Sequence, residues 1–158
     1  MTVRVASALV GSILLAAAGL SAQGSGSRSV TTTAGDAGAA CTALKGLSLD
    51  GDATVTGAAL VTSGALEVAP GTTVRDMPPF CRVQAVSRPS ADSDIYFEVW
   101  LPERARWNGK FLSTGEGGFA GTPNYTRNGL DGAMDEIVRR GYATASTDTG
   151  HKNTEEWW

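Results

Sequence analysis

The chain has 158 residues and a formal net charge of −3 at pH 7, a length that fits one domain. Its lysines and arginines form no basic patch and no basic amphipathic segment, which argues against a nucleic-acid partner and against a membrane surface. Two cysteines and one histidine at these spacings do not make a tetrahedral ligand set, so we expect no metal site.

The first 22 residues have the layout of a secretory signal peptide. One positive charge, at Arg4, is followed by an uncharged stretch rich in alanine, leucine and valine that ends in small residues. This stretch is short for a membrane span and no stop-transfer flank follows it; a buried N-terminal helix fits these flanks less well. We therefore expect residues 1–22 to be removed and the protein to be secreted or periplasmic.

Residues 23–40 contain mostly glycine, serine, threonine and alanine, with almost nothing that could fill a core. They predict a flexible linker, which leaves residues 41–158 as the folded part. The two cysteines, Cys41 and Cys81, form an even pair in a chain that we expect to be exported. In an oxidising compartment such a pair predicts a Cys41–Cys81 disulfide.

Residues 46–68 hold short β-prone pieces separated by glycine, aspartate and serine, which predicts small antiparallel strands. The clearest strand is DIYFEVWLP, residues 94–102, where side chains alternate with a period of two. One face of this strand has Ile95, Phe97, Val99 and Leu101, and the other has Tyr96, Glu98 and Trp100.

A second strand, KFLST at residues 110–114, leads into the glycine loop, GEGGFAG at residues 115–121. Apolar residues then recur with the spacing of a surface helix: Leu130, Met134, Ile137 and Val138. Gly141 lies where a left-handed cap would end that helix. Residues 142–150 predict a buried strand followed by a loop. Strand, loop, helix and strand in succession predict an α/β sheet with a crossover.

The glycine loop has three interpretations. Gly115, Gly117 and Gly118 approach the spacing of a dinucleotide fingerprint, but no helix opens directly after them and the chain has no G-K-[ST] phosphate loop. A glycine-rich loop after an early strand fits better the oxyanion loop of a hydrolase, in which a backbone N–H stabilises the charge that develops on a substrate carbonyl. A plain glycine-rich surface turn would have the same composition.

Four motifs resemble the N-terminal part of the tannase and feruloyl esterase family, which also contains the hydrolase of mono(2-hydroxyethyl) terephthalate. They occur in the family's order over about residues 41–158, as FCRV (80–83), VWLP (99–102), WNGKFLSTGEGGFAG (107–121) and GYATASTDTGH (141–151). The resemblance implies an exported α/β-hydrolase that cleaves esters of aromatic acids, such as hydroxycinnamic or gallic acid, with a Ser-His-Asp triad and a large inserted lid. The fold it implies for this chain is the N-terminal part of an α/β-hydrolase sheet, preceded by small antiparallel β elements.

Three positions take a meaning from the resemblance. Gly115 falls at the position whose backbone N–H is one of the two oxyanion donors. Cys41 and Cys81 match the family's first disulfide. Glu116 departs from the small polar amide that is common there, which leaves the role of this side chain open but not that of the Gly115 N–H.

The triad is missing from the chain. The family's nucleophile lies in G-C-S-x-G, and neither this string nor any G-x-S-x-G occurs. Ser113 precedes the loop in a strand and has no elbow geometry. By the resemblance, the triad serine, aspartate and histidine, the lid and any calcium ligands in it would lie beyond Trp158. We expect a chain truncated before its nucleophile and lid, without a cofactor of its own.

His151, near Asp148, is a candidate base, but a base needs a nucleophile within hydrogen-bond reach and none is identifiable. The resemblance implies instead that His151 shapes a loop at the rim of the active site. Residues 124–126, NYT, formally make an N-glycosylation sequon. Two functions remain: part of an aromatic-ester hydrolase with a small-molecule substrate, or a small exported binding or structural module, mostly β, without catalysis.

Overall fold

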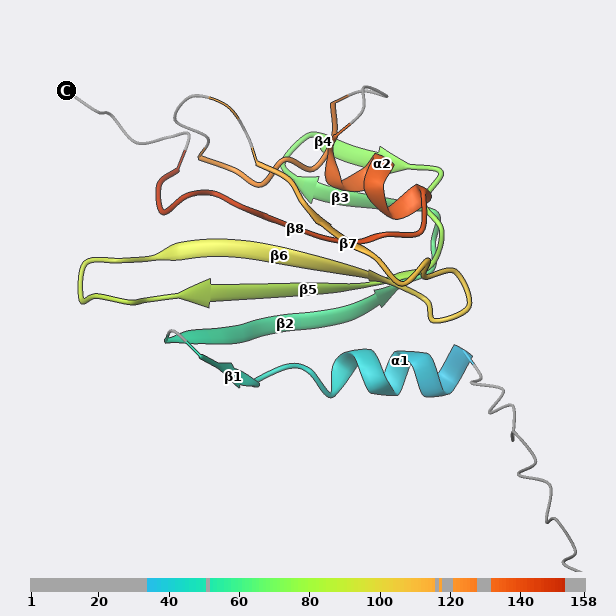
Figure 1. The fold of residues 1–158 in the computed structure, drawn as a ribbon, viewed down its shortest axis with the longest axis horizontal. Helices are drawn as coiled ribbons and strands as arrows, with labels where there is room; N and C mark the ends of the chain where they lie inside the picture. Colours follow the sequence, from blue (N-terminus) through green and yellow to red (C-terminus); the bar gives the residue numbers. More distant parts are fainter. Residues whose placement is uncertain (1–33, 51, 116, 118–120, 128–131, 153–158) are drawn as a thin grey trace, which may run out of the picture. The chain divides into compact units, whose positions relative to one another are not determined.

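The structure is a computed structural model that describes residues 34–50, 52–115, 117, 121–127 and 132–152 (Figure 1). The predicted signal peptide at residues 1–22 lies outside these residues, as does Leu130 of the predicted helix. No helix among the described residues is long and apolar enough to cross a membrane.

Among the described residues, six strands form the main sheet, in the order β1-β2-β5-β6-β8-β7, and two more form a separate hairpin; Figure 1 shows their arrangement. The main sheet has β1 (Ser48–Leu49), β2 (Ala53–Val61), β5 (Phe80–Ser87), β6 (Ile95–Pro102), β8 (Ala143–Thr147) and β7 (Phe111–Ser113). The hairpin has β3 (Ala65–Ala69) and β4 (Thr72–Arg75). Paired strands are antiparallel except β7 and β8, which are parallel. The predicted α/β class with small antiparallel elements is confirmed.

The parallel pair is built by a crossover. The chain leaves β7, passes through the glycine loop and α2 (Met134–Arg139), and returns as β8 beside β7. Helix α2 packs against β8 and β6, as an apolar helical stripe requires. Two parallel strands joined through a helix are the unit from which α/β sheets are built, so the predicted crossover is present.

Gly141 ends α2 as the sequence predicts. Its φ is +81°, and its N–H donates to Val138 O at 2.9 Å while the N–H of Tyr142 donates to Ile137 O at 3.2 Å. These two bonds satisfy the last carbonyls of the helix in the pattern of a Schellman cap. A Cβ at Gly141 would also lie 2.6 Å from Arg106 O. Both the positive φ and this close approach therefore require glycine.

The linker expected over residues 23–40 is wrong at its C-terminal end. Helix α1 (Ala34–Thr42) begins inside it and packs against β2 and β5. A shortage of large apolar side chains does not prevent a helix here, because alanine is the strongest helix former and Asp36 is placed favourably in the first turn. The disulfide of Cys41 also fastens the helix to the sheet.

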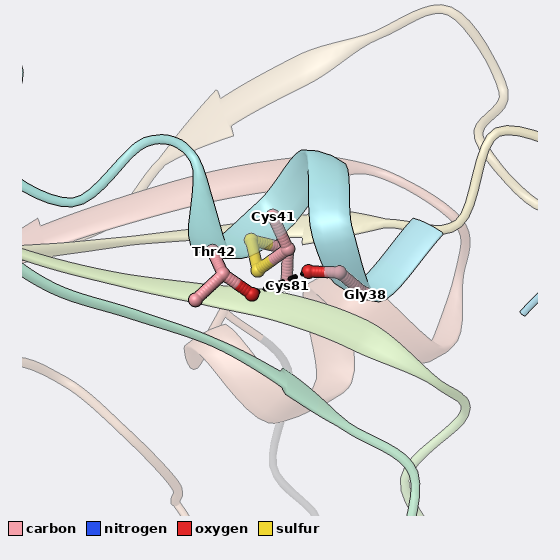
Figure 2. Close-up of a disulfide and its surroundings, with 4 residues drawn as sticks. All are labelled: Gly38, Cys41, Thr42 and Cys81. Carbon is pink, nitrogen blue, oxygen red and sulfur yellow. Dashed lines mark hydrogen bonds between the residues drawn. A yellow bond between two sulfur atoms is a disulfide. The ribbon is translucent and has the colours of Figure 1, made fainter. Parts of the chain in front are cut away.

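The disulfide joins α1 to the main sheet. Figure 2 shows Cys41 on α1 bonded to Cys81 on β5, with the Cα atoms 5.7 Å apart. Both cysteines are buried in an apolar cluster with Val55, Val83 and Ala85. The bond closes a loop across 40 positions of sequence, which restricts the unfolded chain.

Replacing Cys41 and Cys81 together by serine is expected to lower the free energy of unfolding by about 3–4 kcal/mol, because the unfolded chain regains the entropy of that loop. Urea unfolding of the oxidised chain and of the double variant measures this difference. Reductant should lower the midpoint of the parent and leave that of the variant unchanged. Equal midpoints, or two free thiols in the mass of the non-reduced parent, would contradict the prediction.

The two faces of the sheet have separate cores. The face towards α1 holds Cys81, Val83 and Ala85 of β5, with the half-buried Phe97, Val99 and Leu101 of β6 beside them. The opposite face holds Phe80 and Trp100, both with no exposed surface. Hairpin β3–β4, Tyr125 and α2 cover this second face, through Val68, Val74, Met134 and Val138.

The alternation predicted for residues 94–102 is present in β6, but its apolar face is not the more buried one. Phe97, Val99 and Leu101 are half-buried, whereas Glu98 and Trp100 are fully buried. A charged residue therefore lies in the better-covered core.

Candidate functional site

The glycine loop begins at the carboxyl end of β7. Because β7 and β8 are parallel, the residues that follow them lie at the same edge of the sheet, where ligands bind in open α/β sheets. The N–H of Thr114 donates to Ala145 O at 2.9 Å, which extends the pairing by one residue. Gly115 comes next and is exposed, and no described residue accepts a hydrogen bond from its N–H. At the other end of the loop, Gly121 N–H donates to Asp148 O at 3.3 Å.

Ser113 lies two residues before Gly115, and Glu116 follows Gly115 directly. Ser113 is the last residue of β7, and its hydroxyl lies 3.4 Å from Ala145 O, in the strand and not at an elbow. Glu116 lies outside the described residues. The geometry at the loop therefore offers a backbone N–H at Gly115 as the group that a carbonyl oxygen could approach.

Asn124 is the buried polar residue beneath the loop, with 1% of its surface exposed. Its Nδ2 lies 3.0 Å from Thr114 Oγ1, 3.2 Å from Gly115 O and 3.2 Å from Gly132 O. Sequence reasoning noticed Asn124 only as a sequon. A side chain buried to this degree cannot carry a glycan in the folded chain, so the sequon has a structural meaning instead.

Asp148 follows β8 directly and anchors the loop that contains His151. The carboxylate of Asp148 is 2% exposed and accepts hydrogen bonds from Tyr96 N at 3.0 Å and Gly150 N at 2.9 Å, and it pairs with Lys152. His151 donates its backbone N–H to Asp148 O at 3.4 Å, and its Nδ1 lies 3.4 Å from a threonine hydroxyl. These contacts hold the loop at the carboxyl end of β8; a role of His151 at the rim of an active site stays a prediction.

A groove of about 380 Å³ opens near the far end of the glycine loop. Its lining includes Arg88, Asp94, Tyr96, Gly121, Asp148 and Lys152. Of the described lining residues, the cations Arg88 and Lys152 each pair with an aspartate, Asp94 and Asp148 respectively. Within the part of the chain that the structure describes, no three histidine, cysteine, aspartate or glutamate residues are grouped to hold a metal ion.

Glu98 is the centre of a buried polar cluster that sequence reasoning missed. Arg82 donates to both of its carboxylate oxygens, at 2.7 and 2.5 Å. The hydroxyls of Tyr96 and Tyr125 donate at 2.5 and 2.8 Å, and the indole N–H of Trp100 donates at 2.7 Å. The alternation of β6 predicted that Tyr96, Glu98 and Trp100 share a face. This shared face was the sequence feature that could have indicated the cluster.

The cluster changes the acidity of its members. Burial, followed by the charge of Glu98 and the hydrogen bond to it, raises the pKa of Tyr96 to about 12. Burial and then Glu98 also raise the pKa of Tyr125. For Arg82, burial lowers the pKa, but the hydrogen bond and charge of Glu98 outweigh burial and hold it above its ordinary value. Both tyrosines therefore keep their protons and stay donors, and Tyr125 ties the segment after the glycine loop to the sheet.

Comparisons with known proteins show which family and fold this chain is similar to. Residues 81–156 match the family model described as tannase and feruloyl esterase. An uncharacterized esterase of Xanthomonas campestris is 45% identical over 120 residues, which are 76% of this chain and 19% of that protein. Feruloyl esterase C of Talaromyces stipitatus is 38% identical over 74 residues, 47% of this chain and 12% of that one.

The fold has a solved counterpart. The crystal structure of feruloyl esterase B from Aspergillus oryzae superposes with a TM-score of 0.62 and 29% identity, over 75% of this chain and 22% of that one. The chain thus spans roughly a fifth or less of the curated relatives described above.

Proposed function

Because the chain belongs to the tannase and feruloyl esterase family, we propose that it forms part of an exported hydrolase for esters of aromatic acids, in which Gly115 donates its backbone N–H to the substrate oxyanion. Attack on an ester carbonyl places negative charge on the carbonyl oxygen. A fixed N–H donor lowers the energy of that state without having to reorganise during the reaction. The single observation that carries the proposal is the exposed residue Gly115 at the carboxyl end of a parallel strand, whose N–H has no acceptor among the described residues.

The nucleophile would come from outside this sequence, since no G-x-S-x-G occurs in it. In the described part of the chain β7 is an edge strand, and Phe111 and Leu112 on it are 59% and 46% exposed. An unpaired edge is a site where another strand can add. A strand added here, parallel to β7, would end close to Gly115. A serine in a sharp strand-to-helix turn at that end, as in a nucleophile elbow, would then lie near the Gly115 N–H.

The remaining parts of the proposal rest on the family resemblance and on the sequence. The Ser-His-Asp triad, the lid and any calcium in the lid would belong to segments beyond residue 158. Export rests on residues 1–22, which lie outside the described residues. The unit that starts with α1 (Ala34–Thr42) would be the N-terminal portion of the hydrolase domain. The substrate would be a small aromatic ester. We propose neither a nucleic acid nor a membrane as a partner of the protein.

Residues 23–158 alone are expected to have no esterase activity. Ester cleavage through a covalent intermediate needs an activated nucleophile, a base for its proton and a group that orients the base. The cysteines are consumed in the disulfide, and no elbow serine is present. Assays with p-nitrophenyl acetate and methyl ferulate measure this. Saturable turnover that disappears in His151→Ala would contradict the prediction and make His151 a base.

The positive test uses a chimeric esterase, in which residues 34–158, with helix α1 intact, replace the corresponding segment of the Xanthomonas campestris esterase. We expect it to hydrolyse the aryl and feruloyl esters that its parent hydrolyses. The parent is the positive control, and the parent lacking this segment is the negative control. A folded chimera without activity, from an active parent, would refute the proposed function and favour a non-catalytic exported module.

A further inference from the structure

We infer that Asn124 is a positioning residue, which holds the glycine loop so that the Gly115 N–H faces the oxyanion. The inference rests on the proposed function of Gly115. It concerns a side chain that touches no reacting atom and acts through Thr114 and through Gly115, the first residue of the glycine loop.

The amide of Asn124 binds both of these residues at once. Its Nδ2 reaches Thr114 Oγ1 at 3.0 Å and Gly115 O at 3.2 Å, and also Gly132 O, just before α2, at 3.2 Å. Two of these three acceptors are backbone carbonyls, which can only accept. The NH₂ group and not the amide oxygen must therefore face them, and this determines how the amide is oriented.

The hydrogen bonds fix the backbone on both sides of the Gly115 N–H. Before it, Thr114 is held through its N–H by Ala145 O and through its hydroxyl by Asn124 and Gly132. After it, the carbonyl of Gly115 is held by Asn124. The peptide unit that carries the Gly115 N–H thus lies between two anchored points. Without the amide, the hydrogen bonds of Thr114 to Ala145 O and Gly132 O would be the last constraints before the Gly115 N–H, and the Gly115 carbonyl would lose the partner that Asn124 provides.

The main chain of Asn124 is anchored independently of its side chain. Its N–H donates to Ser146 Oγ at 2.9 Å, and its carbonyl accepts from Met134 N at 2.9 Å. The next residue, Tyr125, is fastened to Glu98 through its hydroxyl. A change of the Asn124 side chain therefore leaves its own backbone anchored and removes the links of its amide to Thr114, Gly115 and Gly132.

Asn124→Asp tests this link, because aspartate has the same shape but directs oxygen at two carbonyls and cannot donate. In the whole chain, ¹⁵N relaxation of the Gly115 amide is expected to give an order parameter near 0.85, falling below about 0.6 in the variant. Asn108→Asp is the matched control. Asn108 also joins two segments by its amide, with Nδ2 3.1 Å from Arg140 O, but at the other end of β7. The Asn108→Asp variant should leave the order parameter of the Gly115 amide unchanged.

In the chimeric esterase, Asn124→Asp is expected to lower kcat about 100-fold, the usual effect of a misplacement near 1 Å, with little change in KM. A double-variant comparison separates positioning from general damage. In a Gly115→Pro background, where the N–H is absent, Asn124→Asp should lower kcat no further.

The outcomes distinguish this inference from the proposed function. An inactive chimera refutes the proposed function, and the Gly115 order parameter then still decides whether Asn124 orders the loop. In an active chimera, a Gly115 amide that stays ordered in Asn124→Asp, or the same loss of kcat with and without Gly115→Pro, would overturn the inference. An effect of equal size from Asn108→Asp would overturn it as well.

Discussion

Gly115→Pro is expected to lower kcat of the chimeric esterase by about 10²–10³-fold, because proline has no N–H and the loss of one oxyanion donor has an effect of this size. KM should change little, since the hydrogen bond strengthens as charge develops in the transition state. Steady-state kinetics with p-nitrophenyl acetate and methyl ferulate measure both constants. The factor should be similar for the two esters, since both develop the same oxyanion.

Gly115→Ala is the matched control, because alanine adds a side chain and keeps the N–H. No heavy atom of the described residues lies within 4 Å of the position that a Cβ would take, so the methyl group has room. Alanine should therefore retain activity close to that of the parent. A folded Gly115→Pro enzyme with parental turnover would refute the assignment. Equal losses in the proline and alanine variants would show that glycine is needed for space and not as a donor.

Arg82→Met is expected to lower the free energy of unfolding of the chain by about 3–5 kcal/mol, because it leaves the buried charge of Glu98 without its cation. Arg82 donates twice to this carboxylate, and the side chain of Glu98 has no exposed surface. Urea unfolding followed by tryptophan fluorescence measures the change, since Trp100 lies in the same cluster and donates to Glu98.

Arg88→Met supplies the comparison. Arg88 pairs with Asp94 at 2.9 Å, but the two side chains are 60% and 62% exposed. A surface ion pair of this kind contributes about 0–1 kcal/mol. The double variant Arg82→Met with Glu98→Met removes both charges, and it should be more stable than Arg82→Met alone. Equal losses in Arg82→Met and Arg88→Met would show that burial of the Glu98 cluster does not matter to stability.

Local patterns predicted several elements correctly, because each depends on neighbouring residues. The period of two in residues 94–102 gives β6, and the left-handed glycine at Gly141 ends α2. The order of strand, glycine loop, helix and strand predicted the crossover that brings β7 and β8 side by side. The family resemblance, in turn, singled out Gly115 within the glycine loop.

Local patterns could not show which face of β6 is covered. The apolar face of Phe97 and Val99 looks like the core in the sequence, yet Glu98 and Trp100 on the other face are the fully buried residues. The covering groups come from distant parts of the chain, namely hairpin β3–β4, Tyr125 and α2. A carboxylate is stable there only because five hydrogen bonds from four side chains converge on it.

The sequence alone was sufficient for the strand and helix periodicities, the paired cysteines and the position of the glycine loop, since these follow from spacing along the chain. Only the folded structure places Asn124 under that loop and Arg82 against Glu98. In both cases the partners are 9 or more positions apart and meet through strand pairing and the crossover. Buried polar groups must find their donors and acceptors in three dimensions, and spacing along one strand does not specify them.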